Sequence, residues 1–536
     1  MCGILAVIGK KEDKALVSQL SKRMSHRGPD ESDVHVTESG AILCHERLAI
    51  MDVTTGKQPI QGTSSAWMIH NGEIYNYQSL KDNELKDHEF RTTGDSEVIV
   101  HLYEKYGYGF LNKLDGDFSF VVVDGKDFIA ARDPIGVKPL YYGEDADGAL
   151  WFASEMKVLA DQCVEFQAFP PGYYYTPATG FVQYYKPDWY SLEECQEEAD
   201  LKRLRESLIA ATKKRLMSDV PLGVLLSGGL DSSLTSSIAA RLLKEKGKKL
   251  HSFSIGLNED APDLIAARKV ADFLGTDHHE IHFTVEEGIG IIKKLIWHLE
   301  SYDVTSIRAS TPMYFLSKAI TEKGIKVVLS GEGADEIFGG YLYFKNAPSA
   351  EEFQKETISR VKRLSTADCL RADKSTMAHG LEARVPFLDK AFLQTAMEIA
   401  PIHKMPTTHG GVEKYILRKA FDTPEQPFLP DEALWRQKEQ FSDGVGYSWI
   451  DSLIEFTKSQ VTDVELEMAA SKYPVNTPST KEAYFYREIF SEYFPQDSAA
   501  KSVKKWIPKW QKDLDPSGRA SSTHVAQTSF MEAEKA

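Results

Sequence analysis

The sequence contains few cysteines and no long uninterrupted apolar segment. Its 5 cysteines in 536 residues are widely spaced and form no CxxC pair, so neither a disulfide framework nor a structural zinc site is indicated. The first apolar run, residues 4–8, meets charged residues at once and follows no basic segment, which argues against a signal peptide. No run is long enough to span a bilayer. We therefore expect a soluble protein of a reducing compartment, the cytoplasm.

Positive charge is also scarce. The chain has 63 Lys and Arg against 79 Asp and Glu, a formal net charge of -16. Such a surface repels phosphate backbones and anionic lipids, so we expect neither nucleic acid nor a membrane as a main partner. The length predicts two to four domains. The sequence leaves the oligomeric state open, a homodimer included.

The first part of the chain, residues 1–190, is rich in short strand-like runs separated by turn signals. β-branched and aromatic residues fill runs at 4–9, 41–52, 66–75, 118–125 and 128–133. Residues 96–107 have apolar side chains every fourth position and end at glycine, which predicts a helix. We expect an α+β domain with largely antiparallel strands. The acidic stretch 191–203 is either a linker or a solvated helical face.

The second part, residues 191–510, alternates strands with helices. Helices are predicted at 201–217, 231–247 and 263–275, and strands at 220–229, 250–257, 278–283 and 325–331. This alternation favours an α/β domain with a parallel sheet covered by helices on both faces. Residues 511–536 are polar and predict a loosely ordered tail.

One glycine-rich turn, SGGLDSS at 227–233, follows an apolar strand and opens a helix. Gly228 and Gly229 allow a tight turn close to an anion, and the helix N-terminus offers free N–H groups. Asp231 would repel phosphate unless a cation lies between them, so we expect Mg²⁺. The alternative is an ordinary turn with a capping aspartate. A second turn, SGEGADEIFGGY at 330–341, places three acids among four glycines after another strand, which suits a metal–nucleotide site.

Together these motifs carry a family resemblance. SGGLDSS resembles the pyrophosphate-binding loop of ATP-pyrophosphatase adenylating enzymes. With YDVTSIRAST at 302–311, SGEGADE at 330–336, GLEARVPFLD at 380–389 and RQKEQFSDGVG at 436–446, the chain closely resembles glutamine-hydrolysing asparagine synthetases over nearly its whole length except the tail.

This resemblance implies a fold and a reaction. The fold is an N-terminal nucleophile hydrolase sandwich (αββα) with class II glutamine amidotransferase activity, followed by an α/β parallel-sheet adenylating domain. The reaction hydrolyses glutamine to glutamate and ammonia and activates aspartate with ATP as β-aspartyl-AMP, releasing pyrophosphate. Ammonia then displaces AMP to give asparagine.

The second residue, Cys2, has a chemical rationale of its own. Removal of Met1 would leave a thiol and an α-amine on one residue. An α-amine titrates near ~7.7–8.0 and can accept a proton at neutral pH. The thiol would then be a nucleophile with a built-in base.

The resemblance also assigns the glutamine-binding residues. Arg47 would pair with the substrate carboxylate, a bidentate role suited to guanidinium. Asn71 and the N–H of Gly72 would hold the oxyanion, and Glu73 and Asp95 would hold the substrate amine. The segment that would line the site consists of Leu48, Ala49, Ile50 and Met51.

In the adenylating domain the resemblance makes Asp231 and Asp335 the Mg²⁺ ligands and Glu332 and Lys438 catalytic residues. Arg308 would hold aspartate. The remaining ATP-binding residues are Leu226, Ser227, Gly228, Gly229, Ser232, Ile255, Ser330 and Gly331.

Three other interpretations compete with this one. A β-lactam-forming synthetase of the same type would lack Cys2. An amidotransferase that feeds ammonia to a different acceptor would not need the later motifs. A non-catalytic sensor would be expected to have lost Cys2, Asp231 or Lys438, and all three are present.

Overall fold

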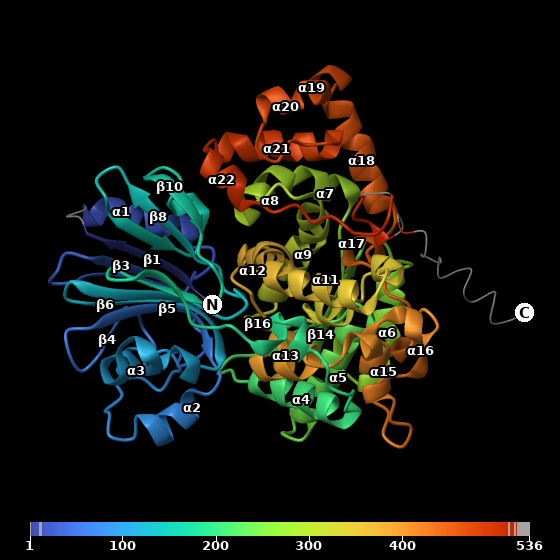
Figure 1. Ribbon diagram of the computed structural model, residues 1–536, viewed down its shortest axis with the longest axis horizontal. Coiled ribbons are helices and arrows are strands. Elements are labelled where there is room, and N and C mark those ends of the chain that lie inside the picture. Colours follow the sequence, from blue (N-terminus) through green and yellow to red (C-terminus); the bar gives the residue numbers. More distant parts are fainter. Residues whose placement is uncertain (1, 10–12, 513–514, 519–520, 522–536) are drawn as a thin grey trace, which may run out of the picture.

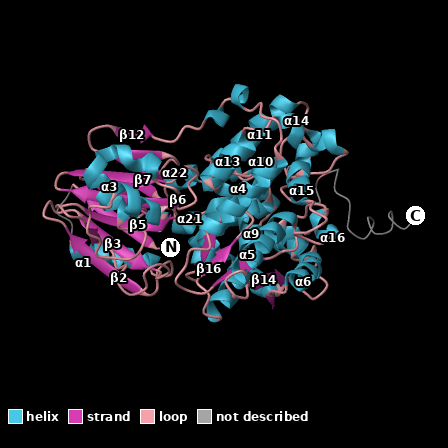
Figure 2. Cartoon of the chain, turned by 90° about the horizontal axis from the view of Figure 1, so that it is seen from below, coloured by secondary structure: helices cyan, strands magenta, loops and turns pink. Residues whose placement is uncertain are grey.

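The computed structural model describes residues 2–9, 13–512, 515–518 and 521. Two bodies lie side by side, a β-sandwich formed by the first part of the chain and a helix-rich body formed by the rest (Figure 1). Figure 2 shows the strands of the sandwich gathered at one end, while the second body surrounds its own strands with helices. In the part of the chain that is described, no helix combines the length and the apolar character needed to cross a membrane.

The sandwich consists of two antiparallel sheets of six strands each. The first has the order β10-β8-β9-β1-β3-β2 and the second the order β12-β11-β7-β6-β5-β4. Their bounds are β1 Gly3–Ile8, β2 Glu31–Val36, β3 Ile42–Arg47, β4 Ile60–Gln61, β5 Trp67–Ile74, β6 Gly116–Asp124, β7 Asp127–Arg132, β8 Tyr141–Asp145, β9 Leu150–Ala153, β10 Cys163–Ala168, β11 Tyr173–Thr176 and β12 Gly180–Gln183.

The alternation of side chains along the strands creates the layers. In β1, Ile4 and Ala6 pack into the core between the two sheets, whereas Leu5 and Val7 pack outward with the helix α1, Lys14–Ser21. The helix α3, Val98–Tyr106, packs against the outer face of the second sheet. The result is the expected αββα sandwich.

The second body contains a parallel sheet of five strands in the order β15-β14-β13-β16-β17. Val224 and Leu329 pack on one face with α5, and Leu225 and Phe253 pack on the other with α8 and α9. The expected α/β domain with helices on both faces is therefore confirmed. The strands are β13 Leu222–Leu225, β14 His251–Gly256, β15 Asp277–His282, β16 Val327–Leu329 and β17 Glu382–Arg384.

Of the remaining helices, α2 belongs to the sandwich and the others surround the parallel sheet or lie beyond it. They are α2 Tyr77–Ser79, α4 Leu201–Lys214, α5 Leu230–Lys244, α6 Pro262–Leu274, α7 Val285–Gly290, α8 Ile292–Leu299, α9 Val304–Glu322, α10 Ala334–Phe338, α11 Ala350–Arg363, α12 Asp368–Met377, α13 Lys390–Met397, α14 Pro401–Lys404, α15 Tyr415–Phe421, α16 Asp431–Leu434, α17 Phe441–Gly444, α18 Ser448–Gln460, α19 Asp463–Glu467, α20 Ala469–Lys472, α21 Lys481–Tyr493 and α22 Asp497–Ser502.

One predicted strand was too long. The run 41–52 forms β3 only as far as Arg47, and the rest is a loop that turns at Asp52, where φ is +46°. The guanidinium of Arg47 donates to the carbonyl oxygen of Asp52 at 2.6 Å, so the loop carbonyls find a side-chain partner in place of a strand.

Residues near the carboxyl end of the described chain contact both bodies. Gln496, next to α22, donates through Nε2 to the carbonyl oxygen of Ala160 in the sandwich at 2.6 Å. Most of the tail predicted for 511–536 lies outside the described residues. In its described part, Asp515 pairs with Arg308 at 2.9 Å.

Buried ion pairs join the two bodies. Arg27 of the sandwich is 0 % exposed. It donates to Asp373 of α12 at 2.8 Å, to Glu155 at 3.1 Å and to the carbonyl oxygen of Cys2 at 3.0 Å. Both carboxylates are equally buried, so this guanidinium holds the second body against the start of β1.

We predict that Arg27→Met destabilises the protein by about 3–5 kcal/mol, because it leaves the buried Asp373 carboxylate without its cation, whereas Glu155 keeps Lys157. The change would be measured as the shift of the denaturant-unfolding transition. Arg23→Met is the matched control, since Arg23 forms an exposed pair with Asp161 whose loss should cost less than about 1 kcal/mol. Equal effects of the two variants would contradict the prediction.

Candidate active sites

The first site surrounds Cys2 at the start of β1. The Cys2 nitrogen donates to Oδ1 of Asn71 at 2.8 Å, and the sulfur lies 4.0 Å from the carbonyl oxygen of Leu48. Burial raises the pKa of the Cys2 thiol. The amino end of β1 lies on the side of the sandwich that faces the second body (Figure 1).

Arg47 lies at the end of β3, next to the segment that the sequence predicted to line this site. Besides Asp52, its guanidinium bonds Glu31 at 2.7 Å. Of the segment itself, Leu48, Ala49 and Ile50 are buried. The loop is anchored by the Asp52 carboxylate, which accepts from the N–H of Thr93 at 2.8 Å.

Strand β5 supplies three consecutive predicted residues, Asn71, Gly72 and Glu73. The Nδ2 group of Asn71 is buried and has no hydrogen-bond partner among the described residues, so it is free to donate to a ligand. Gly72 has φ +148°, and a Cβ at this position would overlap the carbonyl oxygen of Asp117. Only glycine fits here.

Two carboxylates approach the same site. Asp95 accepts from the N–H of Ile74 at 2.7 Å, and burial raises its pKa to about 6. Glu73 is 3.0 Å from Arg384, which belongs to β17 of the second body. Arg384 also donates to Glu382 at 2.5 Å. The first site is therefore built from both bodies.

The second site is a cleft at the carboxyl ends of the parallel strands, where such sheets bind ligands. The cleft is lined by these predicted residues: Leu226, Ser227, Gly229, Asp231, Ser232, Ile255, Ser330, Gly331, Glu332, Asp335 and Lys438. The two motifs separated by about a hundred residues in sequence thus meet in one cleft.

The SGG turn has the geometry of an anion-binding loop. It connects β13 to α5, and Gly228 has φ +72° with Ala266 packed where a Cβ would be. Gly228 does not line the cleft itself but shapes the turn. Ser227 and Ser232 lie with their hydroxyl oxygens 3.0 Å apart at the start of α5. The N-terminus of this 15-residue helix faces the turn, which favours negative charge.

Asp231 and Asp335 lie on either side of a lysine. Lys414 pairs with Asp231 and, at 2.6 Å, with Asp335, and Lys438 pairs with Asp335 at 2.6 Å. Although burial would raise the pKa of Asp335, the two ammonium groups lower it to about 2. Burial raises the pKa of Asp231.

These carboxylates fit a hard divalent cation. Oδ1 of Asp231 is buried and accepts no hydrogen bond from the described residues. Carboxylate oxygens of this kind, next to a phosphate-binding loop, are the donors that Mg²⁺ takes in nucleotide sites.

Glu332 lies at the other side of the cleft. Arg371 of α12 donates to Glu332 at 2.9 Å and to Asp368 at 2.9 Å. Burial raises the pKa of Glu332, and Arg371 opposes the shift.

Arg308 is not among the residues that line this cleft. Its guanidinium is held by Glu482 at 2.7 Å and by Asp515 at 2.9 Å, and it lines a neighbouring cavity. Two other residues of α9, Thr305 and Ala309, which share one helix face, do line the cleft.

Comparison with known proteins finds a family match for each half of the chain. A family described as asparagine synthase matches residues 203–355 and 345–515, and a glutamine amidotransferase domain matches residues 1–174.

The chain belongs to the asparagine synthase family.

An asparagine synthetase [glutamine-hydrolyzing] of Zea mays is 52% identical over 552 residues, which cover 98% of this chain and 94% of the relative. A second such enzyme, from Oryza sativa subsp. japonica, is 52% identical over 97% of this chain and 92% of its own length. A probable asparagine synthetase of Dictyostelium discoideum is 51% identical over 98% of this chain and all of the relative.

Three cations of this asparagine synthase family member were not predicted from the sequence. Lys414 and Arg371 line the cleft, and Arg384 lies between the two bodies. Lys414 follows a Gly-Gly pair at 410–411 that matched no motif, and it has a positive φ of +56°. Arg384 lies inside GLEARVPFLD, a stretch used for recognition, but its side chain acts in the other body. In the sequence, each of these cations is only a charged residue among others, and its partners cannot be identified without the fold.

We predict that Gly72→Ala lowers the stability of the protein by more than about 3 kcal/mol, since it adds an overlap with the backbone to the strain of a positive φ. Gly40→Ala is the control: Gly40 has φ +87° but open space around a Cβ, so it should cost only about 1 kcal/mol. Chemical denaturation of the two variants measures the difference. Equal unfolding midpoints would contradict the prediction, because β5 would then accommodate a side chain at Gly72 despite the nearby carbonyl oxygen of Asp117.

Proposed function

We propose that this protein synthesises asparagine at two centres in one chain. The Cys2 site hydrolyses glutamine to glutamate and ammonia. The cleft activates aspartate with ATP as β-aspartyl-AMP, releases pyrophosphate, and then transfers ammonia to give asparagine and AMP. The observation that carries the proposal is that one chain joins an Asn71-bonded Cys2 with a cleft containing the SGG turn, Asp231, Asp335 and Lys438.

At the first centre the nucleophile is the Cys2 thiol, after removal of Met1, which lies outside the described residues. Because burial raises the thiol pKa, the thiol needs a base, and its own α-amine serves. Oδ1 of Asn71 accepts from that nitrogen at 2.8 Å and orients it toward the sulfur. The thiolate attacks the glutamine amide carbon, and the proton that the amine took from the thiol passes to the leaving ammonia, so that the glutamyl group is held as a thioester on Cys2. Water then hydrolyses this thioester, which releases glutamate and restores the thiol.

The oxyanion formed in this step is held by Nδ2 of Asn71 and the N–H of Gly72. The unpartnered Nδ2 group supports this role, and each such donor contributes about 2.7–4 kcal/mol in comparable sites. Arg47 binds the substrate carboxylate, with Leu48 to Met51 lining the site. Glu73 and Asp95 hold the substrate ammonium, so Arg384 would share Glu73 with it.

At the second centre the SGG turn and the N-terminus of α5 hold the pyrophosphate of ATP. Ser227, Gly228, Gly229 and Ser232 form that cradle. The nucleotide contacts are assigned to Leu226, Ile255, Ser330 and Gly331.

Charge balance is the main task of the cleft, since phosphorus becomes five-coordinate as the aspartate carboxylate attacks. Asp231 and Asp335 would hold Mg²⁺, which supplies charge neutralisation at the phosphates. Lys438 stabilises the transferring phosphate. Glu332, whose pKa burial raises, takes the proton from the attacking ammonia. Arg308 binds a carboxylate of aspartate in exchange for Asp515.

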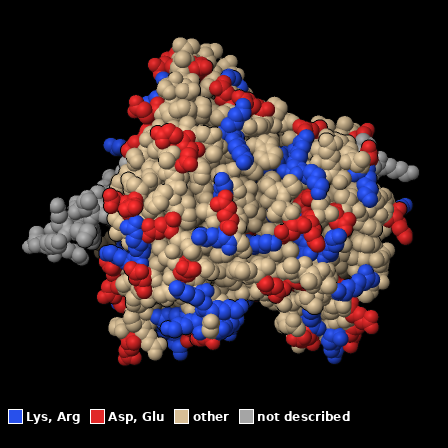
Figure 3. All heavy atoms as spheres, turned by 180° about the vertical axis from the view of Figure 1, so that it is seen from behind, with Lys and Arg blue, Asp and Glu red and all other residues tan. Residues whose placement is uncertain are grey.

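Three further assignments belong to the same proposal. The glutaminase domain comprises residues 1–190, the synthetase domain residues 191–510, and residues 511–536 are a tail. A cytoplasmic location is supported by the five cysteines, all free and buried. The oligomeric state, which the sequence leaves open with a homodimer included, would be measured by light scattering. On the face drawn in Figure 3, acidic side chains are interspersed among most of the basic ones.

The decisive experiment supplies glutamine, aspartate, ATP and Mg²⁺ and follows asparagine, AMP and pyrophosphate. We predict that Cys2→Ala abolishes synthesis from glutamine but leaves synthesis from ammonium salts within about twofold of the parent, because only the first centre loses its nucleophile. Asp231→Asn should abolish synthesis from either nitrogen source. Glutamine use by Cys2→Ala, or release of ADP in place of AMP, would refute the proposal.

Burial raises the pKa of Asp95 to about 6. We therefore predict that kcat/KM for glutamine decreases as the pH drops below about 6, because Asp95 becomes neutral and no longer binds the substrate ammonium. Asp95→Asn should remove this acidic limb of the pH profile and lower kcat/KM at pH 8.

The raised pKa also means that ionising Asp95 destabilises the fold progressively as the pH rises from about 4 to 6. Asp95→Asn should therefore raise the thermal midpoint at pH 8, whereas Asp33→Asn at the surface should change neither property. A pH profile of Asp95→Asn identical to that of the parent would contradict the role.

A further inference from the structure

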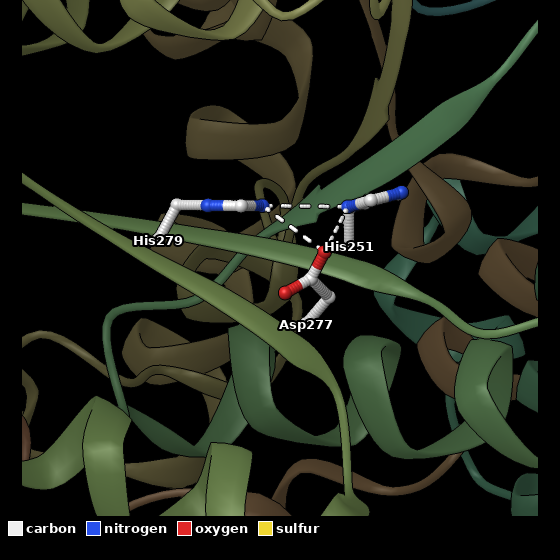
Figure 4. Close-up of side chains that lie close together, drawn as sticks. All are labelled: His251, Asp277 and His279. Atoms are coloured by element: carbon white, nitrogen blue, oxygen red, sulfur yellow. Dashed lines mark hydrogen bonds and ion pairs between the residues drawn. The ribbon is translucent and has the colours of Figure 1, made fainter.

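Three side chains that neither centre uses converge at the amino-terminal end of β14. His251 begins β14, Asp277 begins the adjacent edge strand β15, and His279 follows two residues later on the same face. Figure 4 shows the two imidazoles and the carboxylate pointing toward one another. Ile255, which lines the cleft, lies about 13 Å further along β14.

The three nearest atoms form a compact triangle. Nδ1 of His251 is 3.1 Å from Oδ2 of Asp277 and 3.3 Å from Nε2 of His279, and the third side, from Nε2 to Oδ2, is 3.6 Å. Ligand atoms bound tetrahedrally at 2.0–2.1 Å are separated by about 3.3 Å from one another. A single cation about 2.1 Å from all three atoms would therefore match these distances without movement of the strands, once the two rings, which here point at each other, rotate so that their lone pairs converge on it.

Hydrogen bonds alone do not satisfy this triangle. An ionised carboxylate carries no proton, and each of the two facing ring nitrogens carries at most one. If both nitrogens are protonated, the two N–H groups face each other across 3.3 Å. If one is protonated, its N–H donates either to the other ring nitrogen or to the carboxylate oxygen, and the acceptor left over depends on water. A central cation satisfies all three atoms at once.

The site is also held in place before any ligand binds. His251 and Asp277 are paired neighbours in the parallel ladder of β14 and β15. The ring of His279 stacks on the fully buried Phe253, with centroids 4.9 Å apart and planes 24° apart. Rigid strands and a stacked ring are the kind of support that metal sites require.

We propose that His251, Asp277 and His279 bind one Zn²⁺-class divalent cation that fastens the edge strand β15 to β14. Two imidazoles and one carboxylate favour Zn²⁺ and similar transition metals over Mg²⁺ or Ca²⁺, which prefer oxygen ligands. Three protein ligands leave the fourth position to water. The site lies away from the phosphate turn, so its role is to stabilise the sheet, independently of the proposed function.

The test uses the full chain without a histidine tag, treated with a chelator and then saturated with Mg²⁺ to fill oxygen-ligand sites. Titration with Co²⁺ should give one equivalent of binding and the intense visible absorption of a tetrahedral ion, and Zn²⁺ should displace it. Zn²⁺ should also raise the thermal midpoint, since a ligand that binds only the folded state stabilises it.

Variants assign the signal to the three residues. His251→Ala, His279→Ala and Asp277→Asn should each lose the tetrahedral absorption and the Zn²⁺-dependent rise in midpoint. His282→Ala is the matched control, because His282 is an exposed histidine of the same strand and its loss should change neither. Circular dichroism checks that each variant is folded. No tetrahedral absorption in the parent, or its survival in folded variants, would overturn the site.

Discussion

One of the buried guanidinium groups that link the two halves of this molecule also belongs to the strand next to the cleft. Arg384 is 0 % exposed, and its side chain lies 3.0 Å from Glu73 and 2.5 Å from Glu382. Its carbonyl oxygen accepts from the N–H of Ser330, which lines the cleft. A buried charge that loses its partner costs several kcal/mol. Arg384 keeps Glu382 of its own strand in any case, but the buried Glu73 carboxylate keeps this cation only while the sandwich and the parallel sheet hold their relative placement.

Helix α12 has a similar double role. Its first turn carries Asp368 and Arg371, which line the cleft, and the following turn carries Asp373 and Lys374. Asp373 binds Arg27 of the sandwich, and Lys374 binds Glu300. Since a helix rises only 1.5 Å per residue, the cleft and the interface are within a few ångströms of each other along this helix. One rigid element thus sets the positions of groups on both sides.

The sequence predicted those helices and turns whose local residue pattern agrees with their packing in the folded protein. Residues 96–107, 231–247 and 263–275 were predicted as helices and form α3, α5 and α6 with ends shifted by at most three residues. SGGLDSS was readable because strand, glycine turn and helix occur in one short stretch. The run 41–52 misled because Arg47 satisfies the carbonyls of a loop whose apolar residues are buried.

Sites that depend on contacts between distant segments could not be predicted in the same way. Lys414 reaches Asp231 across 183 residues and Arg27 reaches Asp373 across 346. No local periodicity encodes such pairs. The cluster of His251, Asp277 and His279 is an intermediate case, because its strand and its alternation were predictable but the alignment of β14 with β15 was not.

The buried pairs across the interface also restrict how such a protein can be recombined. Arg27 and Glu73 each meet a partner that belongs to the other half. A chimera that joined this amidotransferase half to the rear half of a relative would bury unmatched charge unless Asp373 and Arg384 came with it. Domain exchange would therefore be tolerated only between chains that share both pairs.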